Sequence, residues 1–219
     1  MIRLLRKELL VEWRSKEMLP TLLLTGILLM VVLSFAFDPT SAMRREAAPG
    51  AFWVTVVFSG VLGLGRSFVA EKENDCLQGL LLAPLDRGTL YLAKVFANAL
   101  FLLAAQAVLV PLFVLFFDLS LGWRLLPWLA VLFLVVVGFS ATGTLFAAVA
   151  LHTRAREILL PLLLLPLIVP LFLAGVRVSQ RAFALKPLDE AVAWIHLAIG
   201  FDVIALVVGW VLFEYVVED

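Results

Sequence analysis

Six long apolar runs dominate the chain, and most of its charged residues fall in the shorter segments between them. Each run is close to, or longer than, the roughly 20 residues that an α-helix needs to cross the hydrocarbon core of a bilayer. The runs predict spanning helices at Leu19–Phe37, Ala51–Phe68, Leu90–Phe117, Leu125–Leu151, Ile158–Val176 and Ala193–Phe213. The pattern therefore predicts an all-α integral membrane protein with six transmembrane helices, in which residues 1–219 form a single transmembrane domain.

The composition supports this fold class. Hydrophobic residues make up 63% of the chain and charged residues only 16%, whereas a soluble domain is about 45–50% apolar. The excess apolar surface requires lipid as its solvent. The formal net charge is zero, which argues against nucleic acid as a partner, because proteins that bind nucleic acid usually carry a basic patch.

The chain lacks the residue patterns of an enzyme. It contains no Gly-x-x-x-x-Gly-Lys-Ser/Thr motif to cradle nucleotide phosphates. The predicted spans hold no Ser–His pair, paired aspartates or metal-ligand cluster, so we predict no catalytic, cofactor-binding or metal site. If ATP drives this protein, we expect the hydrolysing subunit to be a separate polypeptide.

Positively charged residues indicate the orientation, because the cytoplasmic loops of membrane proteins carry an excess of Lys and Arg. With six spans, eleven of the 17 Lys and Arg residues fall on the side of the two chain termini, and six fall on the other side. We therefore expect both termini to lie in the cytoplasm.

The segment before the first span has an amphipathic pattern. Leu5, Leu9 and Trp13 recur at helical spacing, and the basic residues lie mostly on the other side. This pattern is typical of a helix that lies in the membrane interface with its basic side chains near anionic headgroups. We predict an interfacial helix over about residues 1–17. A plain helical lead-in to the first span is the alternative.

The segment between the second and third spans is the most informative part of the chain. Acidic residues open it, leucines at positions i, i+3 and i+4 give it one apolar face, and a proline closes it. Acidic side chains favour a helix N-terminus, and the leucine spacing predicts a short amphipathic helix over about residues 71–84. The residues concerned are Glu71, Glu73, Asp75, Leu77, Leu80, Leu81 and Pro84. Such a helix is suited to docking into a groove of another protein, and a membrane-surface helix without a partner is the alternative.

Three stretches of the chain resemble one family. The opening RLLRKELLVEWRSKE, the stretch GLLLAPLDRGTLYLAKVFANALF, and LLLLPLIVPLFLAG in the fifth span are similar to the CcmB-type permease subunit of the cytochrome c maturation system. The resemblance covers nearly the whole chain and has the same six-span plan. Cys76 departs from it, because a small residue such as glycine is expected before the leucine run.

The resemblance implies a set of partners and a role. Permeases of this family pair with a separate ATP-binding-cassette subunit, CcmA, in the bacterial inner (plasma) membrane, and they work with the haem-handling subunit CcmC. ATP hydrolysis would deliver haem or release the haem-loaded chaperone CcmE from CcmC. The helix over residues 71–84 would be the coupling helix that inserts into the ATPase, with two copies of the permease in each complex.

Haem would then be cargo of the complex and not a cofactor of this chain. Two other functions stay open. One is an ABC-2-type exporter permease for another substrate, which would use the same coupling. The other is an ion-coupled secondary transporter, which would require intramembrane charges and broken helices in matched halves.

Two polar residues lie within the sixth predicted span. Asp202 is deep in the span, where a charge costs roughly 2.5–3.5 kcal/mol on insertion scales, so we expect it to face the bundle interior. We favour a hydrogen bond to Ser140, Thr142 or Gln106 of a neighbouring helix, and a proton or substrate pathway is the alternative. His196, near the outer end of the span, is expected to be an interfacial residue with a hydrogen-bond partner. Axial ligation of haem iron is its alternative role.

Overall fold

The computed structural model describes residues 18–37, 42–73, 86–119, 122–151, 156–187 and 189–218, together with Leu4, Leu5, Lys7 and Leu10. For residues 42–45, 66–73, 151, 156–157 and 217–218 it describes the backbone alone. The long helices are α2 (Met18–Ala36), α3 (Ala42–Glu73), α5 (Arg87–Phe116), α6 (Leu125–Leu151), α7 (Arg156–Phe183) and α8 (Val192–Glu218). The short 3-10 helices η1 (Gly122–Arg124) and η2 (Asp189–Ala191) precede α6 and α8.

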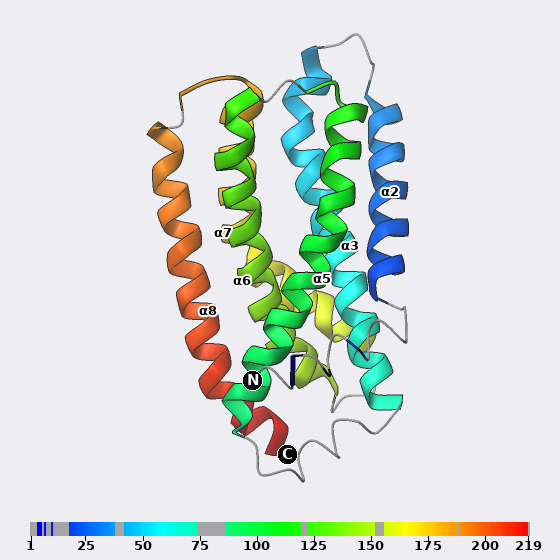
Figure 1. The fold of residues 1–219 in the computed structure, drawn as a ribbon, viewed down its shortest axis with the longest axis vertical. Helices are drawn as coiled ribbons and strands as arrows, with labels where there is room; N and C mark the ends of the chain where they lie inside the picture. Colours follow the sequence, from blue (N-terminus) through cyan, green and yellow to red (C-terminus); the bar gives the residue numbers. More distant parts are fainter. Residues whose placement is uncertain are drawn as a thin grey trace.

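Each of these six long helices contains a segment that is long and apolar enough to cross a membrane. Within the described ranges the chain forms no β-strand. The predicted fold class, an all-α membrane protein with six spans, is therefore confirmed. The helices run side by side in an elongated bundle, with the last turns of α8 at its lower end (Figure 1).

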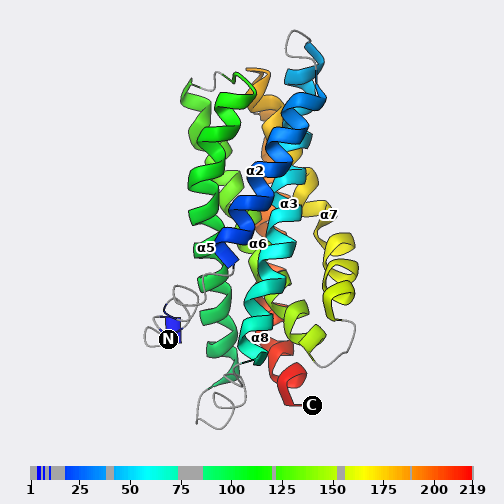
Figure 2. The same ribbon diagram turned by 90° about the vertical axis from the view of Figure 1, so that its right-hand side faces the viewer.

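Helix α6 is the centre of the bundle. It packs most extensively against α7 and α8, and it also contacts α5 and α3. Helix α2 contacts α3 and α5 at one edge, while α8 contacts α5, α6 and α7 at the other edge, as the two views in Figures 1 and 2 show. Small residues let such helices approach closely. Gly60 of α3, for example, leaves the space that the ring of Phe139 from α6 occupies.

A buried aromatic cluster joins three helices near the end of the bundle where α6 begins and α7 ends. Trp53 of α3 and Trp128 of α6 both donate their indole N–H to Ser179 Oγ of α7, at 2.8 and 2.9 Å. Ser179 donates in turn to the carbonyl oxygen of Gly175 at 2.7 Å. Phe52 packs against both indoles, with ring centroids 5.3 and 4.9 Å apart. The cluster therefore buries large apolar rings while satisfying the polar atom of each tryptophan.

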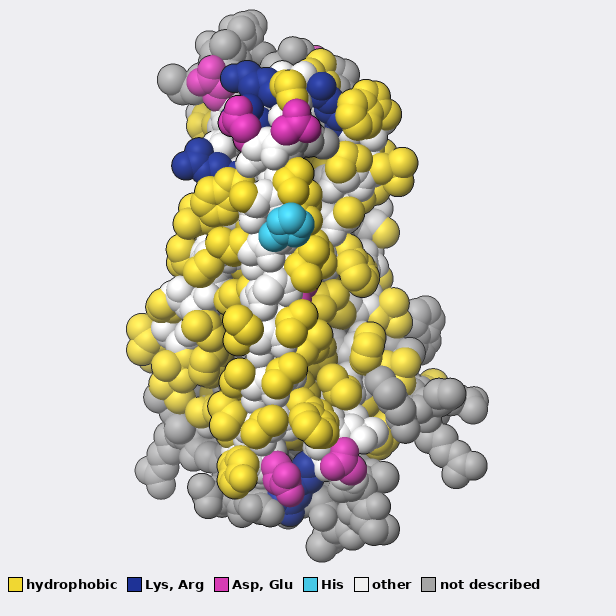
Figure 3. Space-filling model, turned by 90° about the vertical axis from the view of Figure 1, so that its left-hand side faces the viewer, with side chains coloured by type: hydrophobic (Ala, Val, Ile, Leu, Met, Phe, Trp, Pro, Cys, Tyr) yellow, Lys and Arg dark blue, Asp and Glu magenta, His cyan; other side chains and the backbone are white. Residues whose placement is uncertain are grey.

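The outer surface of the bundle is apolar along most of its length. Only 17% of the most apolar stretch of α8 is buried. Its outward-facing residues include Val203, Ile204 and Val207. Hydrophobic side chains cover the middle of the face that α8 forms, and charged side chains gather toward its two ends (Figure 3). An apolar belt with charged ends is the surface that a membrane-spanning bundle presents to lipid or to a neighbouring membrane subunit.

Several helices are longer than the hydropathy pattern predicts. Helix α3 continues through Glu73, past the predicted end at Phe68, α7 continues through Phe183, past Val176, and α8 continues through Glu218, past Phe213. Hydropathy marks where the apolar run ends, whereas backbone hydrogen bonds continue a helix into polar residues at the membrane boundary. Arg177 therefore lies on α7 and not in the loop that follows it.

Candidate functional site

The segment that the sequence singles out for partner docking lies between α3 and α5. Glu71 and Glu73 belong to the last turn of α3, so they do not begin a separate helix. The other predicted coupling residues lie outside the described residues: Asp75, Leu77, Leu80, Leu81 and Pro84. The structure describes the chain again from Asp86, and the coupling helix itself stays a prediction.

Asp86 fixes the point at which α5 begins. Its backbone is extended, with φ −62° and ψ 124°, and its carboxylate accepts hydrogen bonds from Thr89 N and Thr89 Oγ1, each at 2.8 Å. This is the geometry of a helix N-cap, in which a side-chain oxygen satisfies a backbone N–H that has no partner within the helix. The hydrogen bonds from the Thr89 hydroxyl and backbone N–H lower the pKa of Asp86 below 3.8.

The first turns of α5 interlock with the last turns of α8. Gly88 of α5 leaves room for the indole of Trp210, and Gly209 of α8 leaves room for the phenol ring of Tyr91. A side chain larger than hydrogen at either glycine would overlap the ring that it faces. Each helix thus places one large aromatic ring against a glycine of the other, which fixes their relative position along the bundle axis.

Tyr91 extends this contact to a third helix. Its side chain is fully buried, and its hydroxyl lies 3.0 Å from the carbonyl oxygen of Ala141 in α6 and 3.3 Å from that of Ala205 in α8. The hydroxyl has a single proton to donate, and the two carbonyls share it. Sequence reasoning missed this residue. The available signal was a tyrosine within an apolar span, because a buried tyrosine hydroxyl needs a hydrogen-bond partner.

The predicted interfacial helix over residues 1–17 lies mostly outside the described residues. Leu4 is one of the few positions described there, and it is buried beside Leu90, Tyr91 and Phe213 in a hydrophobic cluster at this end of the bundle. The contact places part of the N-terminal segment against α5 and α8. The helix as a whole stays a prediction.

Asp202 is buried between α6 and α8, with 5% of its surface exposed, so the prediction that it faces the bundle interior is confirmed. Its carboxylate lies against the backbone of Gly138, whose missing side chain leaves the space it occupies. Neither carboxylate oxygen has a hydrogen-bond partner among the described residues. The position is therefore set by close helix packing and not by a polar contact.

The favoured hydrogen bond of Asp202 to Ser140, Thr142 or Gln106 is wrong. Thr142 Oγ1 donates to the carbonyl oxygen of Gly138 at 2.7 Å, within its own helix. The side-chain polar atoms of Ser140 and Gln106 have no partner in the described part of the chain. The sequence identifies which polar residues lie on neighbouring helices but not how those helices are rotated and shifted relative to one another.

His196 lies on the outer face of α8 and is exposed. No hydrogen bond connects it to another described residue, so the partner expected for it is missing from this part of the chain. The described residues contain no group of three or more His, Cys, Asp or Glu side chains that could hold a metal ion.

Comparison with known proteins identifies the family. The chain matches the CcmB protein family over residues 1–216. It is 28% identical over 193 residues to heme exporter protein B of Pseudomonas aeruginosa, a match that covers 88% of this chain and 86% of the relative. It is 32% identical over 159 residues to heme exporter protein B of Paracoccus denitrificans, covering 72% of each chain. Because the family match spans nearly the whole sequence, the chain belongs to the CcmB family.

Proposed function

We propose that this chain is the non-catalytic permease subunit of an ATP-binding-cassette complex in c-type cytochrome biogenesis. It would couple ATP hydrolysis by a separate subunit to haem delivery or to release of the haem-loaded chaperone. Membership of the CcmB family carries this proposal. The relatives named heme exporter protein B support haem as the cargo.

The fold supports coupling through the segment between α3 and α5. Force applied to residues 74–85 would reach α5 at its capped start, because Asp86 is hydrogen-bonded to Thr89 there. From α5 the movement would pass to α6 and α8 through the hydrogen bonds and packing of Tyr91. These contacts favour movement of the lower ends of α5, α6 and α8 as one body, which is what a lever between an ATPase and a membrane bundle requires.

The expected partners follow from the same proposal. They are a CcmA-like ATPase, a CcmC-like haem-handling subunit and a CcmE-like chaperone, with two copies of this chain in each complex. The complex would lie in the bacterial inner membrane with both termini of this chain in the cytoplasm. The excess of Lys and Arg on the side of the termini supports that orientation.

Gentle detergent purification of the tagged chain, followed by mass spectrometry of the proteins that accompany it, tests the function. We expect an ATP-binding-cassette subunit together with haem-handling proteins. An ATPase without haem proteins would favour an exporter of another substrate. A chain that purifies alone, under conditions that preserve such complexes, would contradict the proposal and favour an ion-coupled transporter.

A triple substitution tests the coupling helix. Leu77→Asp, Leu80→Asp and Leu81→Asp together are expected to abolish association with the ATPase while membrane insertion continues, because charge replaces the apolar face that would fill a groove. Leu185→Asp is the control for a single exposed Leu→Asp change, since Leu185 is exposed and lies far along the chain from the segment. The readout is the amount of ATPase that copurifies with each variant. If the triple variant associates with the ATPase at the wild-type level, the assignment of the coupling helix to this segment is wrong.

A further inference from the structure

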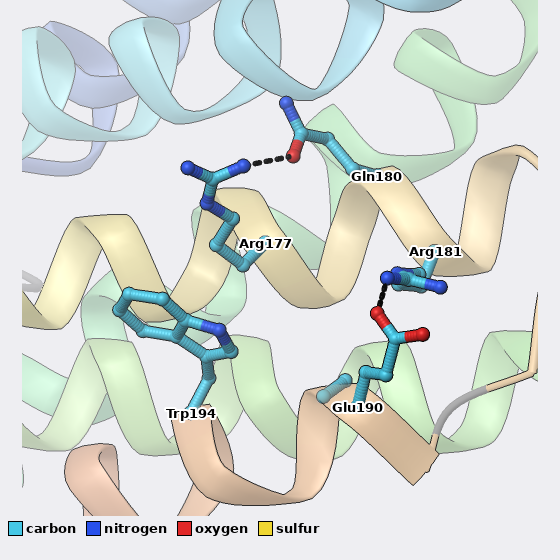
Figure 4. A pocket seen from close by; sticks show the side chains of 6 residues that line it. Arg177, Gln180, Arg181, Glu190 and Trp194 are labelled. Atoms are coloured by element: carbon cyan, nitrogen blue, oxygen red, sulfur yellow. Dashed lines mark hydrogen bonds and ion pairs between the residues drawn. The ribbon is translucent and has the colours of Figure 1, made fainter.

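A cleft opens at the end of the bundle opposite the last turns of α8, where α7 passes into the turn before α8. Its volume is about 600 Å³, and it is lined by residues of α3, α7 and the turn after α7, among them Glu46, Arg177, Arg181 and Lys186. A smaller pocket of about 230 Å³ shares Arg177, Gln180 and Arg181 and extends to Glu190 and Trp194 (Figure 4). The family resemblance and the proposed function assign no role to this region.

The larger cleft carries more positive than negative side chains. Arg177, Arg181 and Lys186 line it with a single carboxylate, Glu46. Arg181 forms an ion pair with Glu190 from η2 (Figure 4). The Arg177 guanidinium contacts only a neutral group by hydrogen bonding, Gln180 Oε1 at 3.5 Å. Neither Arg177 nor Lys186 forms an ion pair within the described part of the chain, so two cations face the cleft without a carboxylate partner.

Arg177 also lies where a cation is costly. It is an exposed residue of α7, within the apolar segment Ile158–Phe183 that is long enough to cross a membrane. A guanidinium in that position avoids hydrocarbon by extending toward the membrane boundary. Its Cζ atom lies 6.0 Å from the centre of the Trp194 ring, and Trp is typical of the headgroup level of a bilayer. The cleft thus joins apolar residues such as Phe183 to a cationic rim near one end of the apolar segment of α7.

We propose that this cleft binds the oxyanion of an amphiphile, a carboxylate or phosphate group whose apolar body lies in the adjoining membrane. The Arg177 guanidinium is suited to bind two oxygen atoms of one such group, because its N–H donors form a planar fork. Lys186 adds a second positive charge from the turn. Arg181 is held by Glu190 and positions the wall between the two pockets. The proposal does not rest on the haem function, since it follows from the residues of the cleft.

Two probes separate the sources of the oxyanion. In the first arm, the full chain in dodecyl maltoside micelles, which contain neither phosphate nor carboxylate, is titrated with haem, which carries two carboxylates, and with haem dimethyl ester, in which both are blocked. Quenching of tryptophan fluorescence beyond that of free tryptophan in the same micelles reports binding. In the second arm, the chain is extracted from membranes that contain phosphatidylglycerol, and native mass spectrometry counts the lipid molecules it retains.

The variants are Arg177→Gln and Lys186→Glu. Lys186 is exposed and lies beyond the end of α7. The control is Arg124→Gln, which removes the same charge from η1 outside the cleft. We expect both cleft variants to weaken one probe about tenfold or more while Arg124→Gln does not, since charge-assisted hydrogen bonds are lost. An effect on haem but not on its ester identifies a carboxylate, and an effect on retained lipid identifies a headgroup phosphate.

A conservative replacement of Arg177 and a check of folding separate loss of binding from loss of structure. Arg177→Lys is expected to restore part of the binding, and each variant must elute as wild type does in size-exclusion chromatography. Because Lys186 is outside the helices and exposed, Lys186→Glu tests the cleft even where Arg177→Gln fails to fold. Wild-type binding of both probes by Arg177→Gln and Lys186→Glu would overturn the proposal, as would equal weakening in Arg124→Gln.

Discussion

Ser179 uses its whole hydrogen-bonding capacity. Its hydroxyl accepts the indole N–H groups of Trp53 and Trp128 and donates its own proton to the carbonyl oxygen of Gly175. Trp53, Trp128 and Ser179 come from α3, α6 and α7, and their side chains are all buried. One small side chain therefore satisfies two large ones, and its removal leaves both indoles without an acceptor.

We predict that Ser179→Ala destabilises the protein by about 1–3 kcal/mol for each indole N–H left without an acceptor. Ser34→Ala is the matched control, because among the described residues the Ser34 hydroxyl donates only to the carbonyl oxygen of Val31 in its own helix. Thermal unfolding in detergent, followed by tryptophan fluorescence, measures the difference. Equal melting temperatures for the two variants would show that the indoles find other acceptors.

At the scale of helices, α8 offers a comparison between two glycines. The space beside Gly209 is filled by the Tyr91 hydroxyl and ring, whereas nothing lies within 4 Å of the position where a Cβ of Gly200 would stand. We predict that Gly209→Ala lowers stability by about 1–3 kcal/mol, as inserting an extra carbon into a packed core does. Gly200→Ala should leave stability unchanged or raise it, since alanine is the better helix former.

The same melting measurement decides between these outcomes. A larger loss for Gly200→Ala than for Gly209→Ala would contradict the close approach of α5 and α8. A Tyr91→Phe substitution in the Gly209→Ala background should recover part of the loss, because the overlap involves the phenol oxygen. The recovery would show that α5 and α8 meet at this pair of residues.

The cap of α5 predicts a dependence on pH. The pKa of Asp86 is lowered in the folded protein by hydrogen bonds from Thr89, relative to 3.8 for the free side chain. The carboxylate therefore stabilises the folded state fully above that value, and this contribution is lost as the pH falls through the folded pKa. The difference in melting temperature between the wild type and Asp86→Ala should be largest near neutral pH and narrow below about pH 4.

Asp86→Asn provides the control for that measurement, because asparagine also caps a helix but does not titrate. Its stability relative to Asp86→Ala should stay constant across the acidic range. A difference between wild type and Asp86→Ala that is constant from neutral to acidic pH would show that the charge of Asp86 does not contribute to the cap.

At the scale of the whole molecule, the hydropathy pattern located all six spans, and the predicted bounds Leu125–Leu151 coincide with α6. The pattern succeeds because each spanning helix must be apolar along its own length to cross the hydrocarbon core, whichever helices surround it. The burial of Asp202 was predictable for the same reason. The neighbours of Asp202 were not predictable, because the rotation of one helix against another depends on pairs of residues from both helices.

The missed contacts show the same limit. Trp53 and Ser179 are separated by 126 positions in the chain, and Tyr91 and Ala205 by 114. No periodicity within one span indicates which distant residue completes a buried hydrogen bond. The family resemblance supplied the functional hypothesis, while the contacts that hold α5 against α6 and α8 came only from the structure.

The spacing of the buried residues in α2 has a consequence for the two helices beside it. They recur every fourth residue, at Met18, Leu22, Gly26, Met30 and Ser34. Four residues exceed one helical turn, so the line they form rotates by about 40° at each step and by roughly 160° over the helix.

This rotation takes α2 from one neighbour to the next. Leu22 fills the space at Gly63 of α3, and Gly26 receives Leu109 of α5. Helices α3 and α5 make few direct contacts with each other, whereas each packs extensively against α2. A movement of α3 can therefore reach α5 through α2 as well as through α6, which places the first helix of the bundle on one of the two packing routes between the helices that flank residues 74–85.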